Sequence, residues 1–375
     1  MQIMVFLIIL GILVIVELFY YRKHALDNVD LDVHFSRPVA HYNEIIEVIE
    51  IAQNNKKLPL PFMLLKFETP TVLEFQDMTN TSVSDLLYRD DMLTMKPFSR
   101  HTRTIKARCC RRGFFSFARV NVSTADLLLM ERMTKEYPTD CTLTILPEKV
   151  STQSLKTLLS ITFSDVMQRR TLLTDPFSFA GIREYQPWDP MRSINWTATA
   201  KAGDFMVNQN TSTSMKQVSV FLNLEFYNIK NSTSLLEKSI SLAYSFISEL
   251  VKAGIPTALY ANGRDIVTQA PVISNTNCDQ GNILERGIAL ARIDLSQKVI
   301  PFPEFLDENS RRNADEYIVV ISPKHDSDFI PAIRNLRRRC SSLLWVMPVY
   351  KSSGKVEIPS DIASYFHRWE VLGHD

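Results

Sequence analysis

The chain has 375 residues, 45% of them hydrophobic and 22% charged, which is typical of globular proteins and long enough for two or three domains. Its 42 Lys and Arg residues balance 41 Asp and Glu residues, so the chain lacks the excess of positive charge that a dedicated nucleic-acid-binding protein carries. The five Cys residues are sparse and form no CxxC pair, which predicts reduced thiols in a cytosolic environment.

The first element along the chain is an apolar run at residues 3–21, IMVFLIILGILVIVELFYY. About 19 residues with a rise of about 1.5 Å each give a helix of about 28 Å, close to the thickness of a bilayer's hydrocarbon core. Positive charge follows the run at Arg22 and Lys23, and no small-residue cleavage site follows it, so the pattern favours an anchor over a cleaved signal peptide. The alternative is a buried core helix of a soluble protein, which an unbroken apolar run fits less well.

The positive charge after the run also predicts the orientation of the anchor. By the positive-inside rule the N-terminus lies outside and the main body is cytoplasmic. We therefore expect a single-pass protein of the cell membrane, with residues 1–24 as the transmembrane anchor and residues 3–21 in contact with lipid.

Residues 30–150 predict a β-rich, sandwich-like domain. Short apolar runs are broken by Asn, Lys and Pro, as in LPLPFMLLKFETP at 58–70. Further strands are expected at 102–109, 114–122 and 142–146, with Gly113 at a hairpin turn.

Residues 216–375 predict a doubly wound α/β domain, because hydrophobic strands alternate with helices. The strands are expected at 217–224, 255–261, 316–322 and 342–349, and the helices at 233–253, 282–292 and 331–339. The run QVSVFLNL at 217–224 is continuously apolar, as in a parallel strand buried on both faces.

Between these two domains, residues 151–215 are expected to form a linker. It contains GIREYQPWDPMRSINWTATAKAGDFMVNQ at 181–209, a strip dense in Arg, Tyr, Trp and Asp with no helical or strand period. This strip resembles the signature of the DUF58 family, a pattern like G-x-R-E-Y-x-P-G-D-D-x-R-x-I-D/N-W-x-A-x-A-R. The matching positions are Arg183, Glu184, Tyr185, Pro187, Asp189, Arg192, Ile194, Asn195, Trp196, Ala198, Ala200 and Lys201. Trp188 and Pro190 replace a Gly and an Asp of the pattern, which removes a permissive backbone position and a carboxylate.

The resemblance implies an α+β multidomain membrane protein of bacterial type. Its parts are an N-terminal transmembrane helix, a β-sandwich-like domain and a doubly wound α/β domain that resembles von Willebrand factor A. The implied partners are a MoxR-type AAA+ ATPase and, in some cases, a transglutaminase-like membrane protein. The implied role is that of a non-catalytic binding or scaffold protein that acts through protein–protein interaction.

The signature supplies the candidate residues for partner binding, which are Arg183, Glu184, Tyr185, Asp189, Arg192, Asn195 and Trp196. Arginines form bidentate pairs with carboxylates, and Tyr and Trp offer large flat surfaces with one hydrogen-bond donor each. Two interpretations remain open. The strip is either a latch packed against the α/β domain or a docking surface for another protein, and the two are compatible.

A domain that resembles von Willebrand factor A binds metal, where it does so, through an Asp-x-Ser-x-Ser turn after its first strand. The corresponding positions here are Asn223, Glu225 and Tyr227, and a later strand end carries Ser322 and Lys324. An amide, a longer carboxylate and a phenol are poor replacements, and a Lys opposes a cation. We therefore expect a degenerate site with no metal and no cofactor, in which Asn223 and Glu225 are the remaining ligand candidates. The rim can still bind a protein, because open α/β sheets bind ligands at the carboxyl ends of their strands.

We expect no enzymatic activity, since the sequence contains no Walker A loop, GxGxxG or GxSxG motif. The alternative is a membrane-associated hydrolase or thiol enzyme with an unrecognised site, for which Cys141 and Cys340 are the candidate nucleophiles. The basic residues of 100–112 predict a solvated face, with anionic lipid headgroups as a second possibility.

Overall fold

The computed structural model describes residues 2–69, 72–76, 81–83, 87–172, 174–187, 189–212, 217–225, 232–274, 281–310, 316–326, 328–340, 342–354 and 356–371. The chain divides into two compact units, Met1–Glu148 and Lys149–Asp375. Each unit encloses its own hydrophobic core.

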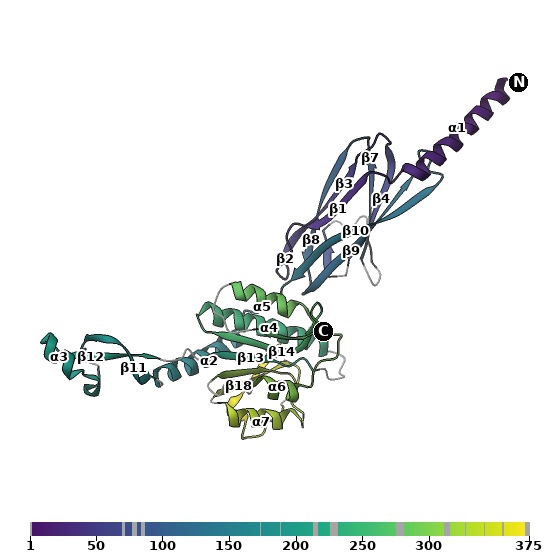
Figure 1. The fold of residues 1–375 in the computed structure, drawn as a ribbon. Coiled ribbons are helices and arrows are strands. Elements are labelled where there is room, and N and C mark those ends of the chain that lie inside the picture. Colours follow the sequence, from purple (N-terminus) through teal and green to yellow (C-terminus); the bar gives the residue numbers. More distant parts are fainter. Residues whose placement is uncertain are drawn as a thin grey trace. The chain divides into compact units, whose positions relative to one another are not determined.

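The first unit begins with α1, Gln2–His24, a helix long and apolar enough to cross a membrane (Figure 1). Its most apolar stretch is exposed over its whole length. Tyr21, near the end of the helix, is buried, and its hydroxyl donates to the carbonyl oxygen of Pro59 at 3.0 Å. Tyr21, Ala25 and Val29 join one apolar cluster with the strands that follow. The last turn of α1 is therefore packed against the β domain through Tyr21.

The rest of this unit consists of two sheets that share a core. The four-stranded sheet has the order β1 (Val29–Phe35), β3 (Ile45–Asn54), β8 (Arg100–Cys109) and β5 (Leu73–Phe75). The six-stranded sheet has the order β2 (Val39–Ala40), β10 (Arg132–Ile145), β9 (Gly113–Ala125), β4 (Leu60–Thr69), β7 (Leu87–Met95) and β6 (Thr81–Val83). Side chains from both sheets meet in one cluster, among them Val48 and Ile105 from the first and Val120 and Leu143 from the second. The predicted β-rich region is confirmed.

The expected hairpin at Gly113 is wrong. β8 pairs with β3 and β5, whereas β9 pairs with β10 and β4, so the turn at 110–112 passes from one sheet to the other. A strand–turn–strand pattern marks a reversal of the chain but does not tell which strands pair. The hairpin of this region joins β9 to β10 through residues 126–131.

The second unit contains a seven-stranded sheet. Its parallel strands are, in spatial order, β14 (Thr257–Asp265), β13 (Val218–Leu222), β17 (Tyr317–Ile321), β18 (Ser342–Tyr350) and β19 (Phe366–Val371). The short strands β15 (Pro271–Ser274) and β16 (Ile293–Asp294) pair with β14 in the antiparallel sense. β13 and β17 are buried along their whole length, as their apolar sequences predict.

Helices cover both faces of this sheet. They are α4 (Ser232–Lys252), α5 (Gly281–Ala291), α6 (Phe302–Ser310) and α7 (Phe329–Arg339), with a 3-10 turn η2 at Ala363–Tyr365. Figure 1 shows α4 and α5 on one side of the sheet and α6 and α7 on the other. Phe302 of α6 and Phe329 of α7 stack on each other, and Phe329 packs against Trp345 of β18. The arrangement is that of a doubly wound α/β sheet.

The linker expected at 151–215 is instead structured and belongs to the second unit. It comprises α2 (Gln153–Leu172), β11 (Thr174–Glu184), a 3-10 turn η1 (Met191–Ser193), α3 (Trp196–Ala202) and β12 (Met206–Ser212). β11 and β12 form a two-stranded antiparallel sheet. The strip showed no period because its elements are short and the pairing of β11 with β12 shifts register twice.

Candidate functional site

The signature strip forms a ribbon, which we define as residues 181–208, from the end of β11 through α3 to the start of β12. Arg183 lies opposite Val207 in the pairing. Beyond the strands, the Tyr185 N–H donates to the carbonyl oxygen of Phe205 at 2.8 Å, and the Asn195 N–H donates to that of Met206 at 2.8 Å. These bonds hold the two ends of the signature together.

An ion pair closes the turn after β11. The Arg183 guanidinium donates two hydrogen bonds of 2.6 Å to the two carboxylate oxygens of Asp189, and the Gln186 N–H donates a third to that carboxylate at 2.9 Å. The hydrogen bonds from Arg183 and then from Gln186 hold the pKa of Asp189 below its ordinary value. The side chain of Asp189 is only 9% exposed, so Arg183 and Asp189 shape the ribbon through their contact with each other.

Asn195 has two structural tasks. Its side-chain oxygen accepts from the Ala198 N–H at 3.0 Å, which caps the start of α3, and its amide group donates to Asn208 Oδ1 at 2.7 Å. Gly203 ends α3 in the left-handed conformation, with φ of 84°. Asn at this position thus joins the helix to β12.

The aromatic residues of the ribbon gather around Phe205, which the sequence analysis did not single out. The ring of Phe205 makes edge contacts with Tyr185 at 6.2 Å and with Trp196 at 6.3 Å between centroids. Phe205 is 55% exposed, Trp196 62% and Met191 68%. Phe205 follows Gly203 and Asp204, at the point where α3 has ended and β12 is about to begin. This position of an aromatic residue directly after a helix end was the signal that could have indicated it.

The remaining candidates divide by exposure. Glu184, Arg192 and Trp196 are exposed, whereas Tyr185 is half-buried. Trp188 lies outside the described residues. Among the residues that the structure describes, the side-chain hydrogen bonds and ring contacts of the signature candidates stay within the ribbon. These contacts account for the ribbon's own shape and leave Trp196, Met191 and Arg192 facing solvent.

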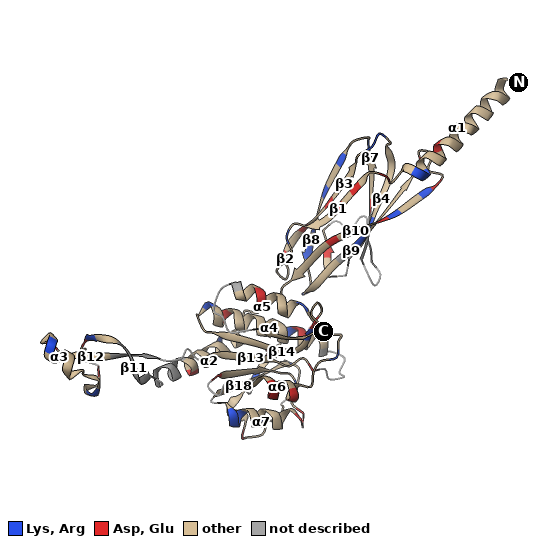
Figure 2. Cartoon of the chain, viewed as in Figure 1, with Lys and Arg blue, Asp and Glu red and all other residues tan. Residues whose placement is uncertain are grey.

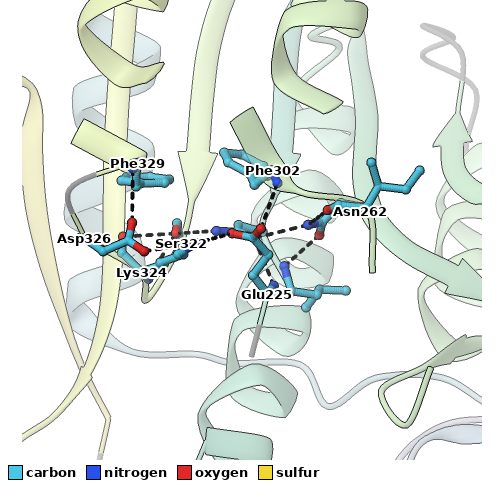
Figure 3. Close-up of polar contacts among 10 residues, drawn as sticks. Glu225, Asn262, Phe302, Ser322, Lys324, Asp326 and Phe329 are labelled. Carbon is cyan, nitrogen blue, oxygen red and sulfur yellow. Dashed lines mark hydrogen bonds and ion pairs between the residues drawn. The ribbon is translucent and has the colours of Figure 1, made fainter. Parts of the chain in front are cut away.

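A second candidate site lies at the carboxyl ends of β13 and β17, which are adjacent in the sheet. Numbered by their order in the chain, the parallel strands are arranged 2-1-3-4-5. The topological switch point, where the strand order reverses, therefore lies between β13 and β17. Asn223 follows β13 and donates through its amide to Ser322 Oγ, which follows β17, at 3.0 Å. Asn262 of β14 donates to Asn223 Oδ1 at 3.2 Å and accepts from the Leu224 N–H at 2.8 Å. The edge of the sheet is therefore closed by amide and hydroxyl groups that bond one another (Figure 3).

Lys324 lies beside these groups, with both its own side chain and that of Glu225 only 15% exposed. Its ammonium contacts Glu225 Oε2 at 2.8 Å and Asp326 Oδ2 at 3.1 Å (Figure 3). The same carboxylates accept from the backbone N–H groups of Phe302 and Phe329, the first residues of α6 and α7. Burial alone would lower the pKa of Lys324, but the hydrogen bonds with Glu225 and Asp326 outweigh it and raise that pKa.

This donor set does not suit a divalent cation. A Mg²⁺ or Ca²⁺ ion requires several oxygen ligands around an open centre, whereas here the Glu225 carboxylate is bound to an ammonium group and Asn223 is bound to Ser322 and Asn262. Tyr227 lies outside the described residues. Asn262 and Asp326 complete the edge and were missed, although an Asn within the apolar strand 257–265 was a visible signal.

Four of the five thiols belong to the described residues, and Cys278 lies outside them. Cys109, Cys110, Cys141 and Cys340 are free. Burial raises the pKa of Cys109 to about 12 and that of Cys141 to about 11, so both are protonated near neutral pH. Cys110 is exposed, but partial burial and the neighbouring Glu74 carboxylate raise its pKa as well. Cys340 is buried at the end of α7.

A cavity of about 270 Å³ lies between the start of α2 and the middle of α4. Its lining residues are Lys149, Val150, Ser151, Thr152, Leu155, Lys156, Leu159, Ser245, Ser248 and Glu249. The lining residues include no Cys that could act as a thiol nucleophile and no His that could act as an imidazole base.

No protein-family model matches the chain, and no curated protein matches it. Solved structures match part of it. A CARDB domain from Pyrococcus furiosus is 15% identical, covers 30% of this chain and 90% of that chain, and has a TM-score of 0.18. A non-cellulosomal cohesin from Archaeoglobus fulgidus is 14% identical, with 34% and 97% covered and a TM-score of 0.23. The neighbours are β-sandwich domains, and at these TM-scores the likeness carries no argument about function.

Proposed function

We propose that this chain is a membrane-anchored, non-catalytic binding protein of the DUF58 family, which works with a MoxR-type AAA+ ATPase. The observation that supports it best is the ribbon, where the signature residues fold on themselves and leave an aromatic surface exposed. Its ion pair and helix cap occupy Arg183, Asp189 and Asn195. The exposed residues Met191, Arg192, Trp196 and Phe205 then form the docking surface.

The chemistry of this surface suits a protein partner. Trp and Arg are enriched among the residues that contribute most to binding at interfaces. Trp buries a large apolar area, and Arg donates several hydrogen bonds. Glu184 is also exposed, so the surface carries both signs of charge. A partner that buries Trp196 and pairs with Arg192 fits it.

The α/β domain supplies the second part of the proposed function. We take it to be the von Willebrand factor A-like domain of the family, which binds its partner at the carboxyl edge of the sheet. Lys324 fills that edge with a side-chain cation, so this binding requires no metal. A transglutaminase-like membrane protein is a second partner consistent with the family.

The anchor is α1, with the N-terminus outside and the main body in the cytoplasm. A cleaved signal peptide is removed from the mature protein, whereas Tyr21 in the last turn of α1 packs in one apolar cluster with Ala25 and Val29, which follow the helix. Cleavage before residue 25 would remove the buried Tyr21 and its hydrogen bond to Pro59.

The test is recovery of the MoxR-type ATPase with the detergent-solubilised full-length chain. The variant Arg192→Ala with Trp196→Ala removes the two exposed anchors of the ribbon. The matched control, Leu284→Ala with Arg338→Ala, removes an exposed apolar residue and an exposed Arg from elsewhere in the second unit. We expect a loss of binding on the order of 2 kcal/mol for the ribbon variant, which is about thirtyfold in affinity, and none for the control. Equal recovery with both variants would contradict the proposal for the ribbon.

A further inference from the structure

The hairpin turn between β9 and β10 exposes an uninterrupted apolar stretch, Leu127, Leu128, Leu129 and Met130, which we name the Leu–Met turn. The four residues are 51%, 51%, 64% and 68% exposed, in that order. Single exposed apolar residues are common on protein surfaces, but a run of four large ones at a hairpin tip is a liability in water. The stretch therefore points to a surface that is covered.

The turn is held in a defined shape. Asp126 is fully buried, and its carboxylate accepts from the Leu128 N–H at 3.1 Å and from the Glu131 N–H at 2.7 Å. The Leu129 N–H donates to the Asp126 carbonyl oxygen at 3.1 Å, and Leu129 adopts a left-handed backbone with φ of 57°. A leucine rarely adopts this conformation, so the hydrogen bonds of Asp126 impose it. The four apolar side chains are thus presented by a built turn.

The Leu–Met turn lies beside the point where the apolar part of α1 ends. The Leu127 N–H donates to Glu17 Oε1 at 2.9 Å, and Glu17 is the charged residue within the apolar run 3–21. Further along α1, Arg22 pairs with Glu131 at 3.6 Å. Phe19 lies between these two contacts in sequence and is 72% exposed. The turn and the end of the apolar helix therefore share one level along α1.

Basic and aromatic residues occupy the same end of the β domain. Figure 2 shows Lys and Arg at the last turn of α1, where Arg22 and Lys23 lie. The ammonium of Lys56 donates to the carbonyl oxygens of Ala25 and Asp27, just after α1. Phe98 donates its N–H to the carbonyl oxygen of Lys56 at 3.2 Å and is 67% exposed. Cations together with exposed Phe and Leu are the composition that a phospholipid interface binds.

We propose that the Leu–Met turn inserts into the phospholipid bilayer beside α1, as a second and monotopic membrane contact. The inference rests on the proposed role of α1 as a membrane anchor. Its occupant is lipid because the turn is continuous with the lipid-spanning helix through the Glu17 and Arg22 contacts. A single helix lets a domain rotate and tilt, whereas a helix and a turn together fix the orientation of the β domain on the membrane.

The experiment uses the full-length chain in vesicles of phosphatidylcholine and phosphatidylglycerol that contain brominated acyl chains, which quench nearby Trp fluorescence. Met130→Trp places the probe in the turn. Tyr42→Trp is the control at the opposite end of the β domain, because β3 runs from Ile45 near Tyr42 to Asn54, which pairs with Val29 beside α1. We expect bromolipid to quench the fluorescence added by Trp at position 130 and to leave that added at position 42 unchanged. Equal quenching of the two would overturn the proposal.

A second set of variants distinguishes insertion of the Leu–Met turn from a position merely near lipid. Leu128→Glu with Leu129→Glu, combined with Met130→Trp, is expected to abolish the quenching, while Tyr42→Glu with Ile45→Glu in the same Met130→Trp chain leaves it intact. Retained quenching after the first pair of substitutions would overturn insertion.

Retention of each chain on vesicles after an alkaline carbonate wash reports on α1 alone. A chain that is washed off contradicts the anchor, whereas a chain that is retained but not quenched contradicts only the turn. Crosslinking of position 130 to a second protein without bromolipid quenching would assign the turn to a protein partner and likewise overturn the proposal.

Discussion

At the residue scale, Lys324 shows how one side chain decides what the edge of a sheet can bind. Its ammonium contacts the carboxylates of Glu225 and Asp326, which also accept from the first N–H groups of α6 and α7. The lysine therefore offsets part of the negative charge of two carboxylates that lie at helix N-termini. Without it, two partly buried carboxylates would lose the cation that they share.

We predict that Lys324→Ala lowers the free energy of unfolding of the second unit by about 1–3 kcal/mol, because the partly buried carboxylates of Glu225 and Asp326 lose their cationic donor and keep only the backbone N–H donors. Lys351→Ala, which removes an exposed lysine from the turn after β18, is the control and should change stability by less than about 0.5 kcal/mol. Urea denaturation followed by near-ultraviolet circular dichroism measures both. Equal effects of the two substitutions would show that the Lys324 contacts add nothing.

The pH dependence of the same contact has a defined sign. The pKa of Lys324 is raised in the folded protein, so its contribution is fully present below the pKa of the unfolded state, about 10.4, and is lost as pH rises through the folded pKa. We predict that the stability difference between the parent chain and Lys324→Ala is constant from about pH 7 to 9 and decreases above about pH 10.4. Denaturation curves of both chains across this range measure it. A difference that increased at alkaline pH would contradict the assignment.

At the scale of elements, the ribbon is a short structure stabilised by its ends. α3 has only two turns and is bounded by the Asn195 cap and by Gly203 in the left-handed conformation. A helix this short does not persist in water alone, so its caps and the pairing of β11 with β12 hold it. Its exposed aromatic surface depends on that support.

We predict that Gly203→Ala destabilises the ribbon by about 1 kcal/mol, because an L-residue is strained at φ of 84° even though its Cβ would meet open space. Gly181→Ala is the control, since that glycine has open space around it and no positive φ. Hydrogen exchange at the amides of Thr199, which bonds to Asn195 in the first turn of α3, and of residue 203, which bonds to Thr199 in the last turn, measures the change. Equal exchange rates in the two variants would contradict the strain argument.

The elements that could be predicted from the sequence are those with a strong period or a long apolar run. The helix expected at 233–253 is α4, Ser232–Lys252, and the strand at 217–224 contains β13, Val218–Leu222. α2 was missed although its buried residues Leu155, Leu158, Leu159, Thr162 and Val166 follow helical spacing, because its mean composition is polar. The ribbon was missed because pairing between distant short segments leaves no local pattern.

The candidate sites followed the same logic. Asn223 and Lys324 were expected at strand ends, and the parallel topology brings strand ends to one edge. The ion pair of Lys324 with Glu225 was not predicted, because sequence order does not show that residues 99 positions apart meet. Nor did the composition of the signature distinguish Arg183 and Asp189, which pair with each other, from Arg192 and Trp196, which face solvent.

At the scale of the whole molecule, the chain consists of two units with separate cores. In the first unit, Tyr21 packs the end of α1 against the β strands. A second cluster, which contains Ile105, lies between the two sheets. The second surrounds a parallel sheet, with Ile318 in its core. A core supplies cooperative stability to the residues that pack in it, so each unit is expected to open as its own cooperative block.

We predict that Ile105→Ala and Ile318→Ala each lower stability by about 2–5 kcal/mol, because both side chains are nearly fully buried and their removal leaves a cavity. Ile105→Ala should accelerate hydrogen exchange at the slowest amides of β3 and β8 and leave those of β13 and β17 unchanged, and Ile318→Ala should do the reverse. The double variant should then equal the sum of the two, since the sites share no packing partner within their clusters. Accelerated exchange in both units after either single substitution would show instead that the two cores unfold as one block.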